Sequence, residues 1–115
     1  MEQTFNKLVR DNIPNKIESN GEIAITRILT DEEYKIELEK KLNEELNEVL
    51  SSSGKDRLEE LADMLEVIKC LAKLEGSSLD EVIDIAQQKK LKRGSFDKKI
   101  FLERTIDKRW KYGTI

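Results

Sequence analysis

Histidine is absent from the 115-residue sequence, and its absence excludes several kinds of catalytic site at once. Ser-His-Asp triads, zinc sites with histidine ligands and acid–base catalysis by imidazole all need this side chain. The single cysteine, Cys70, excludes a disulfide within the chain and a metal site built from cysteines alone. Cys70 lies in the apolar run 65–74, where a small buried side chain is the ordinary interpretation and a catalytic thiol the alternative. Any catalysis therefore depends on carboxylates, lysine, arginine, hydroxyl groups or a bound metal.

Hydrophobic and aromatic residues are scarce, at 37% and 5%, whereas 39% of the residues are charged. A short chain this polar buries a thin core, so we expect it to self-associate. The 21 lysines and arginines nearly balance 24 aspartates and glutamates, and the resulting net charge of -3 argues against a nucleic-acid polymer as partner. The sequence contains neither an apolar run long enough to cross a membrane nor the apolar stretch of a signal peptide. We therefore expect a cytoplasmic protein that does not bind membranes.

Five glycines and one proline mark the ends of the predicted segments. Thr30 and Glu33 have the spacing of a capping box, which predicts a helix start at this point. A short extended segment is expected over 23–29, and the region 96–115 receives no assignment. The predicted helices span residues 13–19, 31–50, 55–74 and 79–92. The sequence thus predicts a single all-α domain over 1–115, an antiparallel helical bundle completed by oligomerisation.

Carboxylates occupy positions on these helices where apolar residues are expected. Helical spacing places one set of residues on a common face of the helix 31–50: Leu38, Leu42, Glu45 and Val49. Glu48 follows Glu45 at i+3, and is therefore its neighbour on the helix surface. The same test places a second set on one stripe of the helix 55–74: Glu60, Asp63, Val67, Leu71 and Leu74. Glu45, Glu60 and Asp63 are therefore predicted to face the bundle interior.

Carboxylates that face a bundle interior need a cation nearby. Without one, an isolated buried carboxylate takes up a proton and loses its charge. Lysine or arginine from a neighbouring element would satisfy this need, and so would a metal. Ligands that are all oxygens favour a hard cation, Mg²⁺ first and Mn²⁺ or Ca²⁺ after it. In a chain this rich in charge, solvated or ion-paired helix faces remain the alternative. A calcium site of the EF-hand type is not expected, because its Asp-x-Asp-x-Asp-Gly loop is missing.

The order of these residues resembles the Glu-x-x-Glu and Glu-x-x-Asp signature of the all-α nucleoside triphosphate pyrophosphohydrolases, the MazG-like superfamily that includes phosphoribosyl-ATP pyrophosphohydrolase. The matching segments are 44–48 and 60–63. The segment 7–14, Lys-Leu-Val-Arg-Asp-Asn-Ile-Pro, looks like the start of small bacterial and phage members, and 93–96, Arg-Gly-Ser-Phe, matches their Arg-Gly-x-Phe. The resemblance covers roughly residues 5 to 103.

The resemblance implies a Mg²⁺-dependent enzyme, for which Mn²⁺ is a possible substitute, acting on a nucleotide. It would cleave a nucleoside triphosphate, or a related nucleotide, between its α and β phosphates and release a nucleoside monophosphate and pyrophosphate. Such an enzyme has a house-cleaning role in nucleotide metabolism. The family also forms dimers or tetramers, so a homodimer or homotetramer is expected. By residue matching, the metal ligands are Glu45, Glu48, Glu60 and Asp63, and either Glu45 or Glu48 accepts the proton of the attacking water.

Candidate phosphate-binding residues are Lys7, Arg10, Lys90 and Arg93. Lys89 competes with Lys90 for one role. Each cation also has an ordinary explanation, as part of a basic N-terminal segment or as a charge favoured at a helix C-terminus. Trp110 and Tyr112 can cover a base or pack against a partner chain. A non-catalytic helical interaction module with solvated acidic faces is the competing functional hypothesis.

Overall fold

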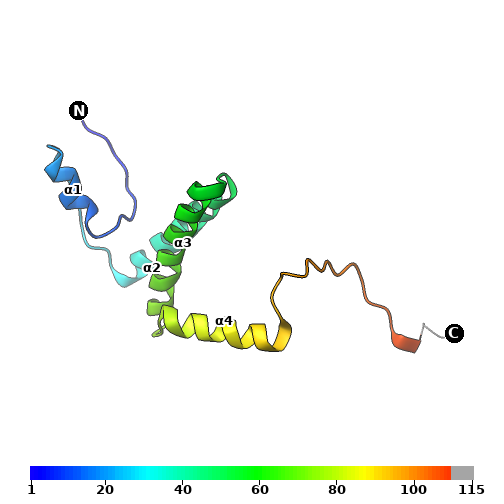
Figure 1. The fold of residues 1–115 in the computed structure, drawn as a ribbon. Coiled ribbons are helices and arrows are strands. Elements are labelled where there is room, and N and C mark those ends of the chain that lie inside the picture. The colour runs from blue at the N-terminus through cyan, green and yellow to red at the C-terminus, as the bar shows by residue number, and fades with distance from the viewer. Residues whose placement is uncertain (110–115) are drawn as a thin grey trace. The chain divides into compact units, whose positions relative to one another are not determined.

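The computed structural model describes residues 1–109, and this part of the chain forms four helices (Figure 1). The helices are α1 (Ile13–Ser19), α2 (Asp31–Leu50), α3 (Gly54–Leu74) and α4 (Leu79–Arg93). Residues 1–109 contain no strand, which confirms the all-α class, and 22–30 belong to neither helix nor strand. The predicted helix boundaries are confirmed to within one residue. Trp110 and Tyr112 lie outside the described residues.

The start of α2 is fixed by the predicted capping box. The Glu33 backbone N–H donates to the Thr30 hydroxyl at 3.2 Å, and the Glu33 carboxylate accepts from the Thr30 backbone N–H at 3.1 Å. Arg27 Nη2 lies 2.8 Å from Glu33 Oε2. The hydrogen bond from Arg27 and that from the Thr30 backbone lower the pKa of Glu33 to about 2. One carboxylate thus ties the preceding segment to the first turn of the helix.

Helices α2 and α3 pack side by side as a helical hairpin (Figure 1). A short turn reverses the chain, and Gly54 begins α3 with a φ of +58°, a conformation that favours glycine. Between the helices, Leu38, Val67 and Ala72 are the buried hydrophobic residues of the described chain. So few buried side chains make a thin core, as the composition predicts.

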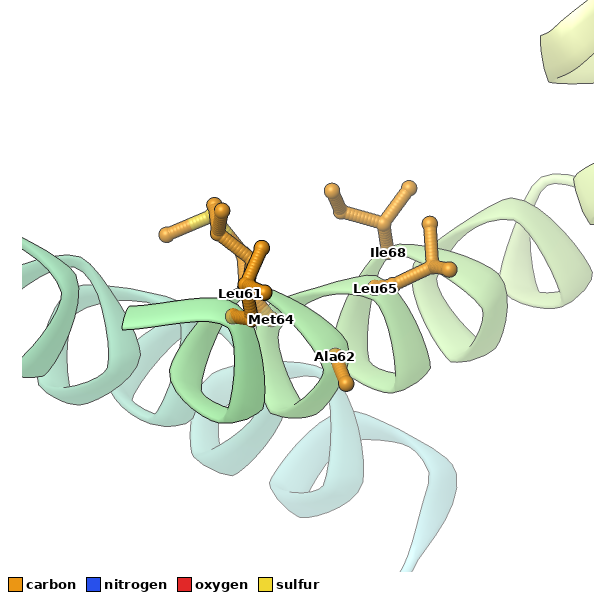
Figure 2. A pocket seen from close by; sticks show the side chains of 6 residues that line it. Leu61, Ala62, Met64, Leu65 and Ile68 are labelled. Carbon is orange, nitrogen blue, oxygen red and sulfur yellow. The ribbon is translucent and has the colours of Figure 1, made fainter. Parts of the chain in front are cut away.

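The opposite side of α3 carries apolar side chains that α2 does not cover. Leu61, Met64, Leu65 and Ile68 project away from α2 (Figure 2), and Ala62 is exposed beside them. Together with Leu58, these residues line a shallow apolar depression. Leu58 is 67% exposed and Leu65 is 47% exposed. We call Leu58, Leu61, Met64, Leu65 and Ile68 the apolar face of α3.

The end of α3 and the start of α4 lie where the glycine and serine residues of the sequence predict them. Gly76 adopts a φ of +73° just after α3, and the Ser78 hydroxyl accepts from the Glu81 backbone N–H at the start of α4. The chain divides into two compact units, residues 1–82 and a second that starts at Ile83, so the division falls within α4. None of the helices within 1–109 combines the length and the apolar composition that crossing a bilayer requires.

Candidate metal centre

Glu45 lies on the face of α2 that packs against α3. Only 7% of its surface is exposed, whereas its neighbours along the chain, Glu44 and Leu46, are exposed. Leu38 is buried on the same face, and Leu42 and Val49 are half-buried. The helical spacing therefore predicted correctly that a carboxylate takes a seam position.

Two carboxylates of α3 meet Glu45 at this position. Glu60 and Asp63 are half-buried, and one carboxylate oxygen from each of the three residues lies within 4.8 Å of the other two. The i, i+3 spacing places Glu60 and Asp63 on adjacent turns of the same face of α3. The hairpin thus brings Glu45 together with residues that follow it by 15 and 18 positions in the sequence. Of the predicted acidic pairs, α2 contributes one member and α3 contributes two. We call Glu45, Glu60 and Asp63 the acidic triad.

Burial and the neighbouring carboxylates both disfavour the ionised form of Glu45. Its pKa is raised, first by burial and then by the negative charges of Asp63, Glu60 and Glu44, while Lys41 acts in the opposite direction. Glu45 Oε2 is buried and has no hydrogen-bond partner among residues 1–109. A buried polar atom without a partner is unusual in a folded protein, because losing its water costs free energy that no contact returns.

Arg10 supplies a positive charge to the acidic triad from far away in the sequence. Arg10 Nη2 lies 2.7 Å from Asp63 Oδ1, and the two residues are 53 positions apart. Arg10 was predicted as a phosphate-binding residue, and its pairing with Asp63 was not foreseen. The expectation that lysine or arginine from a neighbouring element offsets the carboxylates is met at Asp63.

The remaining predicted site residues are all exposed to solvent. Glu48 is exposed and is not a member of the acidic triad. Lys7 is exposed in the N-terminal segment. Lys90 and Arg93 are exposed in the last turn of α4, where cations interact favourably with the helix dipole.

Cys70 lies beside Tyr34, apart from the acidic triad. Its side chain is half-buried, as is that of Tyr34. Burial and a hydrogen bond with Cys70 raise the pKa of Tyr34 to about 12. A partly buried cysteine that interacts with a tyrosine hydroxyl agrees with the packing interpretation of this residue.

The donor set of the acidic triad fits a hard divalent cation. All three side chains offer oxygen, and Mg²⁺ is commonly held by a small number of carboxylates together with substrate phosphates. Such an ion would also give Glu45 Oε2 the partner that it lacks within the described chain. The residues present are therefore chemically suited to Mg²⁺ or Mn²⁺.

Comparison with known proteins gives little further information. No protein-family model matches the chain, and no solved structure matches it. Over 50 residues the chain is 40% identical to an uncharacterized protein of Mycolicibacterium smegmatis. That match covers 44% of this chain, and the chain spans about half the length of the curated relative, 51%.

Proposed function

We propose that the chain is a Mg²⁺-dependent pyrophosphohydrolase that cleaves a nucleoside triphosphate between its α and β phosphates. The observation that carries the proposal is the buried Glu45 carboxylate, which has an unpartnered oxygen and lies within 4.8 Å of the Glu60 and Asp63 carboxylates. The reaction class comes from the resemblance of segments 44–48, 60–63 and 93–96 to the MazG-like superfamily. A house-cleaning role remains part of the proposal.

The residues of the acidic triad would hold the ion. When bound, Mg²⁺ offsets the negative charge, polarises phosphate oxygens and lowers the pKa of water. Glu45 would accept the proton of the attacking water through the carboxylate oxygen that does not hold the ion. Glu48, one turn along α2 and exposed to solvent, is the alternative acceptor. This chemistry needs no histidine.

Cations of the chain would then bind the phosphates. Arginine and lysine stabilise the negative charge that develops on departing pyrophosphate. The candidates are Lys7, Arg10, Lys90 and Arg93. Arg10 already lies next to the acidic triad, so it is the one whose position most directly supports this role.

The test is a screen for pyrophosphate release from canonical and damaged nucleotides and from phosphoribosyl-ATP in the presence of Mg²⁺. We expect Glu60→Gln and Asp63→Asn each to lower turnover by at least about tenfold, because each removes an anionic ligand. Glu59→Gln is the matched control, since Glu59 is exposed on the same helix and lies outside the acidic triad. Circular dichroism checks that the variants remain helical. Absence of pyrophosphate release from every substrate, or normal turnover in both triad variants, would refute the proposal.

The competing hypothesis is a non-catalytic helical interaction module, which would also use the uncovered apolar face of α3. That face serves association in either case, so it does not discriminate between the two functions. Calorimetric titration with Mg²⁺ and a non-hydrolysable nucleotide does discriminate, because only the enzyme hypothesis requires both to bind.

We propose further that a second copy of the chain covers the apolar face and completes a MazG-like helical bundle. Three buried hydrophobic side chains within 1–109 are few for a stable domain, and the apolar face offers further area to bury. We expect Leu65→Glu to produce a monomer in size-exclusion chromatography with light scattering. Ile23→Glu is the control, because Ile23 is 85% exposed and lies outside α3. A wild-type monomer at micromolar concentration would contradict this assembly.

A further inference from the structure

Resting on the proposed metal centre, we infer that Arg10 and the divalent cation compete for Asp63, so that binding of the ion releases the N-terminal segment from α3. Arg10 thus pairs with the Asp63 carboxylate only while no ion is bound. The proposed function assigns Arg10 to phosphate, but it does not say how Arg10 becomes available for that role.

The Arg10–Asp63 pair is the polar contact between the N-terminal segment and α3. Among residues 1–109, the 2.7 Å pair of Arg10 Nη2 and Asp63 Oδ1 is the only hydrogen bond or ion pair between residues 1–12 and α3. The Arg10 side chain is 57% exposed and that of Asp63 is 44% exposed. An ion pair this accessible to water is weak and is easily exchanged for a stronger cation.

The two cations make conflicting demands on Asp63. Arg10 donates to an oxygen of the same carboxylate that the acidic triad offers as a ligand. A divalent ion carries twice the charge of a guanidinium. The ion and the Arg10 guanidinium would repel each other if both bound the Asp63 carboxylate. The ion also interacts with Glu45 and Glu60, with which Arg10 forms no hydrogen bond or ion pair, so it is the stronger competitor.

Once it is released from Asp63, Arg10 can bind phosphate. A freed guanidinium keeps its charge and its fork of donors, which match two oxygens of a phosphate. Arg10 would therefore bind phosphate only after the ion has taken Asp63. This sequence of events makes binding of an anionic substrate dependent on prior binding of the ion.

The first experiment measures Mn²⁺ binding by titration, with free Mn²⁺ followed by electron paramagnetic resonance. We expect Arg10→Ala to bind Mn²⁺ more tightly than the wild type, by up to about fivefold, because the competitor is removed. Lys16→Ala is the matched control, since Lys16 is an exposed cation of the nearby helix α1 and forms no ion pair with Asp63; its affinity should stay close to that of the wild type. Equal or weaker binding by Arg10→Ala would overturn the inference.

The second experiment detects release directly. Trypsin cleavage after Lys7 is followed by mass spectrometry with and without Mn²⁺. We expect Mn²⁺ to accelerate this cleavage in the wild type and to have no effect in Arg10→Ala, in which the segment is already free. An unchanged rate in the wild type would overturn the inference. If both proteins bind Mn²⁺ equally, only the inference fails; if neither binds it, the metal centre fails as well.

Discussion

Replacing Glu45 by leucine should stabilise the metal-free protein while abolishing its response to Mg²⁺. Glu45 is 7% exposed, one of its oxygens lacks a partner, and two further carboxylates lie within 4.8 Å of it. Burying an unpartnered polar group costs about 1–3 kcal/mol, and leucine at a seam position returns hydrophobic free energy instead.

We therefore expect the free energy of unfolding of Glu45→Leu to exceed that of the wild type by about 1–3 kcal/mol in the presence of a chelator. For a domain of this size, each kcal/mol corresponds to a rise in the melting temperature of about 4–8 °C. Added Mg²⁺ should stabilise the wild type, because a ligand that binds only the folded state raises its stability, and should leave Glu45→Leu unchanged.

The assay is thermal unfolding followed by circular dichroism, in chelator and in excess Mg²⁺. Glu39→Leu is the control for added hydrophobicity, since Glu39 is exposed on the same helix. The reasoning is wrong if Glu45→Leu melts below the wild type in chelator, or if Mg²⁺ stabilises both proteins equally.

Two other outcomes follow from local structure. The pKa of Glu33 is lowered from 4.5 to about 2, so its contribution to stability is complete above about pH 4.5 and is lost as the pH falls through about 2. Glu33→Gln should reduce the pH dependence of unfolding in this window, which an acid titration followed by circular dichroism measures. Gly76 has a φ of +73°, so Gly76→Ala should lower the free energy of unfolding by about 1 kcal/mol, whereas Gly76→Asn should cost less; chemical denaturation compares the two variants.

The helices could be predicted from the sequence because their signals are local. The Thr30 and Glu33 capping box lies within four residues, and Gly76 marks the end of α3 directly. The position of Glu45 could also be predicted, because a period of 3.6 residues assigns it to the same face as Leu38 and Val49. Such inferences need only neighbours along the chain.

The exact membership of the acidic triad could not be predicted in the same way. Glu45 and Glu48 both lie near the seam by helical spacing, and the angle at which α3 packs on α2 decides which of them is buried. The Arg10–Asp63 pair depends on the path of 53 residues, for which the sequence holds no local signal. Packing between distant elements determines both the burial of Glu45 and the Arg10–Asp63 pair.

Because the acidic triad is divided between two helices, its geometry also depends on how those helices are aligned along their length. Sliding α3 along α2 by one helical turn would move Glu60 and Asp63 by about 5.4 Å, more than the 4.8 Å within which the three oxygens now lie. A cation held by residues of both helices would resist such a shift. It would therefore stabilise the alignment of α2 and α3, between which few apolar side chains are buried.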